Sequence, residues 1–245
     1  MNGPTQKPAI TFADYKEAES RLVSLREAAA EGFREAQAHG DLIAGERWRE
    51  DLQRGLNEFK LFREKLPEDV RLLINAEKIL ESFSVSADGF VSLVIPGDVT
   101  DRGAIKALNT RFRELFPEKS NDAINETEAL FLLGIGSEQR RGLGTPRTIK
   151  VLPVVPGTIH MSRDEQSEVL RKKGLVFANS LEQAFAAAAW ACQRNEQAMF
   201  NGLHARGSAH RCGMFQFRDG RIVTEAFRDV VSDSELCASG SVLPL

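Results

Sequence analysis

The stretch FSVSADGFVSLVIP, residues Phe83 to Pro96, separates a helical sequence pattern from a mixed one. Apolar residues alternate with polar ones on both sides of Asp88-Gly89, which is typical of two β-strands joined by a two-residue turn. Upstream of this stretch the apolar residues follow the period of a helix. The change of period predicts an α+β chain, with a helical N-terminal region over residues 10–82 and a mixed α/β domain with β-hairpins over residues 83–245.

The N-terminal region is expected to form a helical hairpin followed by a third helix. Residues 14–39 and 48–66 each carry an apolar stripe at steps of three and four. Gly40 suits the end of the first helix, and Pro67 suits the start of the third. Residues 1–82 carry 13 Lys and Arg against 16 Asp and Glu, whereas the other 163 residues carry 19 of each. We expect this highly charged helical region to pack on, or extend from, the domain that follows.

The mixed domain shows further start and stop signals. Thr100 begins a helix that stops before Pro117, and Ser162 and Ser180 open two more helices with capping boxes. The last of these is rich in alanine and is predicted to run to Phe200. Strands are expected at 128–136, at 148–155, at 174–178 and on both sides of Asp219-Gly220.

Composition excludes several classes of protein. A net charge of -3 gives no overall electrostatic basis for binding nucleic acid. No signal peptide or membrane-spanning run is visible. The three cysteines are widely spaced and odd in number, which indicates reduced thiols and a cytoplasmic protein rather than a disulfide scaffold. We predict no cofactor and no membrane association.

The glycine-rich stretch GIGSEQRRGLGTPR, residues 134–147, fails both nucleotide-binding motifs. The third glycine of a dinucleotide fingerprint is replaced by Gln139, and the spacing from Gly136 to Gly142 is too long for a P-loop. Its arginines could clamp a phosphate or carboxylate, and the alternative is a solvated connector between strands. The candidate anion ligands in this stretch are Arg140, Arg141 and Arg147.

The stretch HARGSAHRC, residues 204–212, is the second candidate. The spacing of His204, His210 and Cys212 matches no common zinc site, so we predict no metal. An anion site is more credible, and a polar loop is the alternative. Its candidate ligands are Arg206, His210 and Arg211.

Residues 83–245 resemble an uncharacterised bacterial family. The resemblance lies in the order of FVSLVIPGDV, ALFLLGIG, RKKGLVFANSLEQAFAAA and CASG. Phe215 and Phe217 stand where the family pattern has tryptophans. The resemblance implies a bacterial origin and a shared fold, and it transfers no catalytic residue because the family has no established activity.

Two functions follow as expectations. The first is a non-catalytic accessory protein that binds a protein partner, or a second copy of itself, through its amphipathic N-terminal helices. The second is an enzyme or binding domain for an anionic small molecule, with its site formed by residues 134–150 and 204–212. The sequence does not decide whether the chain is an enzyme.

Overall fold

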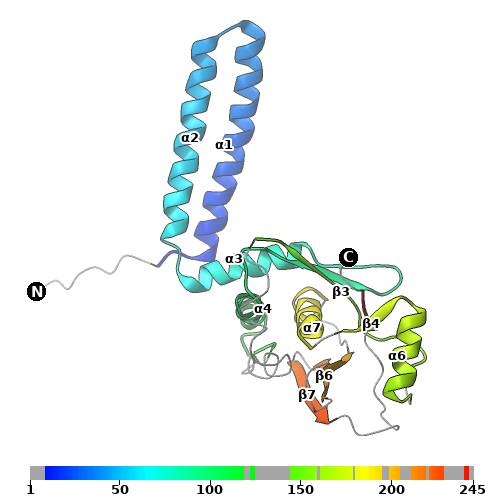
Figure 1. Cartoon of the computed structure of the whole chain (residues 1–245). Helices are drawn as coiled ribbons and strands as arrows, with labels where there is room; N and C mark the ends of the chain where they lie inside the picture. Colours follow the sequence, from blue (N-terminus) through cyan, green and yellow to red (C-terminus); the bar gives the residue numbers. More distant parts are fainter. Residues whose placement is uncertain are drawn as a thin grey trace, which may run out of the picture. The chain divides into compact units, whose positions relative to one another are not determined.

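The computed structural model describes residues 9–118, 122–124, 144–158, 161–178 and 180–194. It also gives the backbone of four strands at 199–204, 211–218, 221–228 and 240–242, and only the backbone of Arg163 and Ser180. The contacts of the chain divide it into two compact units, residues 1–71 and 72–245. Each unit is described separately, and Figure 1 labels their elements.

The first unit is the predicted helical hairpin. Helix α1 (Phe12–His39) and helix α2 (Leu42–Glu64) run antiparallel and lie side by side (Figure 1). Thr11 and Asp14 form a capping box at the start of α1, and Asp41 caps α2 by accepting from the Ala44 amide. Gly40 ends α1 at a φ of 67°, where its amide donates to carbonyls of the last turn. The prediction that Gly40 ends this helix is confirmed. Glycine suits the position because a residue with a Cβ would be strained at this φ.

The two helices interlock through a pair of glycine notches. A Cβ at Gly32 of α1 would lie 2.0 Å from the indole nitrogen of Trp48 on α2. Reciprocally, a Cβ at Gly55 of α2 would lie 2.3 Å from a methyl group of Leu25 on α1. At each of these two glycines, the missing side chain leaves room for a large side chain of the other helix. The buried residues of α1 are Tyr15, Leu22, Ala29, Gly32 and Ala36.

Helix α3 (Glu68–Glu81) begins directly after Pro67, as predicted. The contact boundary at residues 71 and 72 falls inside this helix, whereas the sequence pattern placed the boundary at residue 82. The reason is packing, because Ile79 and Leu80 of α3 belong to the hydrophobic core of the second unit.

The second unit contains a five-stranded antiparallel sheet in the order β1-β2-β3-β8-β4. Strands β1 and β2 form the predicted hairpin, but residues 86–90 connect them, so the turn that contains Asp88-Gly89 is longer than the two residues expected. The short last strand, which the sequence did not reveal, lies between β3 and β4 and joins them. The strands are β1 (Ser84–Val85), β2 (Val91–Ile95), β3 (Arg147–Leu152), β4 (Leu175–Phe177) and β8 (Gly240–Val242).

Three helices of the second unit follow the capping signals. Helix α4 (Asp101–Leu115) starts at the Thr100 cap, and helix α6 (Arg163–Lys172) starts at the Ser162 capping box, as predicted. Helix α7 (Ser180–Arg194) begins at the second predicted capping box. The side-chain amide of Gln183, which a capping box would direct to the backbone of Ser180, donates instead to the Ala178 carbonyl oxygen at 2.8 Å.

Helix α7 is the centre of the second unit. It packs against α4, against β2 and β3 of the larger sheet, and against a smaller sheet (Figure 1). Residues 184–189 are all 0 % exposed, and five of the six are alanines. A helix that is apolar on every side is a core element, and small side chains allow sheets to approach it closely.

The smaller sheet has the order β5-β6-β7. Its strands are β5 (Met199–His204), β6 (Arg211–Arg218) and β7 (Arg221–Arg228), and β6 and β7 form the hairpin predicted around Asp219-Gly220. The prediction that the alanine-rich helix continues to Phe200 is wrong, since α7 ends at Arg194 and β5 begins at Met199. The strand expected at residues 128–136 lies outside the described residues.

Candidate functional site

Most of the predicted anion ligands lie in the two candidate stretches rather than in the described helices and strands. Arg140, Arg141, Arg206 and His210 lie outside the described residues, and of Arg211 only the backbone, in β6, is described. The meeting of the 134–150 and 204–212 segments therefore stays a prediction.

Arg147, the remaining candidate, makes contacts inside the second unit. Its guanidinium group forms an ion pair and hydrogen bond with Asp101, which is 5 % exposed in the first turn of α4. The guanidinium carbon also lies 5.8 Å from the centre of the Phe185 ring on α7. Its Nε atom is buried and has no partner among the described residues. Arg147 thus connects β3 to both α4 and α7.

The backbone of the smaller sheet brings one histidine and two arginines into one register row. His204 of β5 is paired with Arg211 of β6, and Arg211 is paired with Arg228 of β7. His204 is the first residue of the candidate HARGSAHRC stretch and Arg211 is its last arginine, so the pairing of β5 with β6 brings these two residues together. Arg228 was missed in the sequence, because only the hairpin register shows it opposite Arg211.

Neither metal nor thiol chemistry is supported by the described side chains. They contain no group of three residues suited to hold a metal ion. Cys192 on α7 is a partly buried free thiol that packs against the core, and its burial raises its pKa to about 12, with Arg111 acting in the opposite direction. Because the thiolate is the reactive form, Cys192 is unsuited to be a nucleophile.

The second unit has a pocket of about 800 Å³ at one end of the five-stranded sheet. It lies where β2 begins, β3 ends and β4 begins, beside Trp190 of α7. Its walls are mainly aromatic, aliphatic and proline side chains, and two charged residues are added to them. The lining residues are Ala87, Asp88, Gly89, Phe90, Leu152, Pro153, Val154, Pro156, Lys173, Leu175 and Trp190.

Local hydrogen bonds hold one wall of this pocket in place. In the turn between β1 and β2, the Ser86 amide donates to the Phe90 carbonyl at 2.9 Å, and the Phe90 amide donates to the Ser86 hydroxyl at 3.1 Å. Gly89 completes the turn at a φ of 83°. The ring of Trp190, another lining residue, packs edge-on against Phe83 with 6.3 Å between the ring centres. The aromatic walls are therefore formed in the free protein.

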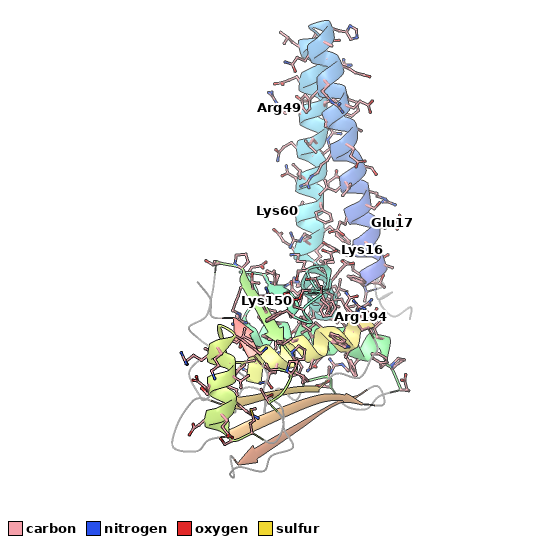
Figure 2. The ribbon with its side chains drawn as sticks, turned by 90° about the vertical axis from the view of Figure 1, so that its right-hand side faces the viewer. Lys16, Glu17, Arg49, Lys60, Lys150 and Arg194 are labelled. Carbon is pink, nitrogen blue, oxygen red and sulfur yellow. The ribbon has the colours of Figure 1, made fainter. Side chains whose placement is uncertain are left out.

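One lysine and one aspartate line this pocket, and a second lysine lies against one of its aromatic walls. Lys173 and Asp88 belong to its lining, and both are exposed. The ammonium group of Lys150 lies 4.9 Å from the centre of the Phe90 ring, and Figure 2 labels this lysine on β3. Lys150 lies in an expected strand and Trp190 in the alanine-rich helix, so the local sequence patterns do not mark either residue as part of a site.

The hairpin of the first unit exposes apolar side chains. Leu42 and Ile43, in the first turn of α2, are 87% and 70% exposed. No residue of α2 is fully buried, and its apolar stripe from Trp48 to Phe62 is only half-buried. The side chains of Arg49 and Lys60 project outward from the same helix (Figure 2). One neighbouring helix covers this stripe incompletely.

Comparisons with known proteins identify no relative. No family model, no curated protein and no solved structure matches the chain. Among the described helices, none combines the length and the apolar character that crossing a membrane requires.

Proposed function

We propose that this chain is a non-catalytic accessory protein that binds a protein partner through its α1–α2 hairpin, and that a second copy of the chain is this partner. The observation that carries the proposal is the exposed pair Leu42 and Ile43 at the turn of the hairpin. Single exposed apolar residues are normal on protein surfaces. Two adjacent exposed apolar residues on a helix whose apolar stripe is only half-buried are typical of an interaction site.

A second hairpin is the partner that best fits the apolar stripe of α2. In a two-helix hairpin each helix has one helical neighbour, whereas in a four-helix bundle each has two, and the inner stripes are covered. Trp48, Leu52 and Phe59 are half-buried within the hairpin. Two copies would bury these stripes against one another, and short isolated hairpins depend on such packing for their stability.

The test is the oligomeric state of the full chain, measured by sedimentation and light scattering. We expect a dimer. The double variant Leu42→Glu/Ile43→Glu should be monomeric, because two carboxylates at the interface would lose their hydration. Glutamate is a good helix former and is favoured in a first turn, so α2 should remain folded in this variant.

The matched control adds the same two charges elsewhere on α2. Gln53 and Asn57 are exposed and bonded to each other at 3.1 Å, so Gln53→Glu/Asn57→Glu changes the charge without removing apolar surface. This control should remain a dimer. A monomeric unmodified chain would refute the proposal, and so would a dimer that survives the change at residues 42 and 43.

A further inference from the structure

The pocket at the end of the five-stranded sheet has the size and lining of a small-molecule site. Its volume is about 800 Å³, and small-molecule pockets usually span roughly 300–1,000 Å³. Phe90, Leu152, Leu175 and Trp190 provide an apolar interior. Such an interior binds the apolar body of a ligand by removing both surfaces from water.

The pocket needs little rearrangement to bind. Hydrogen bonds between Ser86 and Phe90 close the turn that carries one wall, and contact with Phe83 holds the Trp190 ring of the other wall. Ordering of side chains and loops is a main cost of association. Since these walls are already ordered, more of the apolar burial contributes to affinity.

The charges around the pocket favour a negatively charged ligand. Lys173 lies in the lining and Lys150 stacks on the wall residue Phe90, whereas Asp88 is the carboxylate of the lining. The lining therefore holds one ammonium group and one carboxylate, and a second ammonium group lies beside the lining at Phe90. An acidic head group gains from this excess, and a cationic one does not.

The surrounding backbone favours a single negative charge over a phosphate. Helix α6 ends at Lys172, so the carbonyl end of its dipole lies beside Lys173, where it opposes negative charge and opposes a doubly charged group more strongly than a singly charged one. Among the described lining residues, none belongs to a helix N-terminus, the element that commonly binds phosphate. We infer that this pocket binds a small organic monocarboxylate, with its apolar body against Phe90, Leu152 and Trp190 and its carboxylate at Lys173.

Titration calorimetry of the full chain with three ligands of one chain length tests the head-group preference. Octanoate, octanol and octylamine share an apolar body and differ in charge. We expect octanoate to bind more tightly than the other two ligands. Lys173→Gln should weaken octanoate binding about tenfold, the loss of one charge-assisted contact, and should leave octanol unchanged.

Two further variants test whether octanoate binds inside this pocket. Asp88→Asn is the matched control, because it removes the opposite charge from the same lining, and octanoate should then bind equally well or more tightly. Val154 lines the pocket and is 38% exposed, so Val154→Trp should fill the space and abolish binding while the far-ultraviolet circular dichroism stays unchanged. Absence of octanoate binding, equal affinity of Lys173→Gln, or binding retained by Val154→Trp would each overturn the inference.

Discussion

The glycine notch at Gly32 predicts a stability change of unexpected sign. In an exposed helix, replacing glycine by alanine stabilises by roughly 0.5–1 kcal/mol. At Gly32 the new Cβ would lie 2.0 Å from the Trp48 indole nitrogen and 2.2 Å from its Cε2 atom. Since non-bonded carbon atoms need a separation of roughly 3.5–4.0 Å, the Trp48 indole must move by about 1.5 Å or leave the interface between α1 and α2.

The balance of these two effects is destabilising. Overpacking of this kind costs about 1–3 kcal/mol, which exceeds the gain in helix propensity. We expect Gly32→Ala to lower the free energy of unfolding by about 1 kcal/mol after that gain is subtracted. Gly45→Ala is the matched control, because its Cβ would lie 3.8 Å from the Ala36 Cβ, an ordinary contact. The control should stabilise by about 0.5–1 kcal/mol.

The assay is urea unfolding of the full chain, followed by far-ultraviolet circular dichroism. Tryptophan emission adds an independent signal, because displacement of Trp48 toward water should shift its emission to longer wavelength. In a Trp48→Ala background the obstruction is gone, so Gly32→Ala should become stabilising. The reasoning is refuted if Gly32→Ala is as stable as Gly45→Ala, or if the Trp48→Ala background leaves its sign unchanged.

Three further predictions concern single groups. Tyr15 is the only tyrosine of the chain, and its pKa is raised from 10.0 to about 12, first by burial and then by a hydrogen bond to a glutamate. The contribution of this shift to the free energy of unfolding should be complete below pH 10 and lost as the pH rises through about 12. Titration of tyrosinate absorbance in native and in urea-unfolded protein will give the two pKa values. Cys192, with its pKa raised to about 12 by burial, should resist alkylation at neutral pH in the native chain and react once the chain is unfolded; fast native labelling at this residue, located by mass spectrometry, would contradict the placement. Asp101→Asn should destabilise by about 2–3 kcal/mol because it leaves the Arg147 guanidinium partly buried without its counterion, whereas Asp98→Asn, at an exposed carboxylate, should have almost no effect in the same urea titration.

Features of the fold that depend on local chemistry were predictable from the sequence. Thr11, Thr100 and Ser162 cap their helices through side-chain oxygens within three residues. Gly40 and Gly89 take the left-handed backbone that ends a helix or turns a hairpin. These signals can be recognised in the sequence because each depends on residues within one short stretch. The cap and its hydrogen-bonding partner lie within three residues, and the left-handed backbone depends on the glycine itself.

Elements that depend on distant partners were not predictable. Strand β8 has three residues and no apolar alternation, and it exists because β3 and β4 each offer it an edge. Strand β5 follows α7 after a short connection, and its apolar start at Met199 and Phe200 extends a helical pattern equally well. In both cases tertiary pairing decided between conformations that the local sequence allowed.

The pocket was hidden in the sequence for a similar reason. Its lining comes from the turn before β2, the end of β3, the start of β4 and the C-terminal part of α7. Each contributing residue has an ordinary local explanation, such as a turn for Asp88 or core packing for Trp190. Only the sheet order brings these segments to one end of the unit.

The position of β8 also constrains when the second unit can be completed during synthesis. Strands β1, β2 and β3 can pair once residue 152 has emerged, but among the described strands β4 pairs with β8 alone. The 62 residues between Phe177 and Gly240 take roughly 3–12 s to synthesise at about 5–20 residues per second. Throughout that interval β3 and β4 each present an open edge, and open edges recruit strands from other chains. The nascent chain therefore passes through a vulnerable period, which ends when its last strand is inserted between two that are already made.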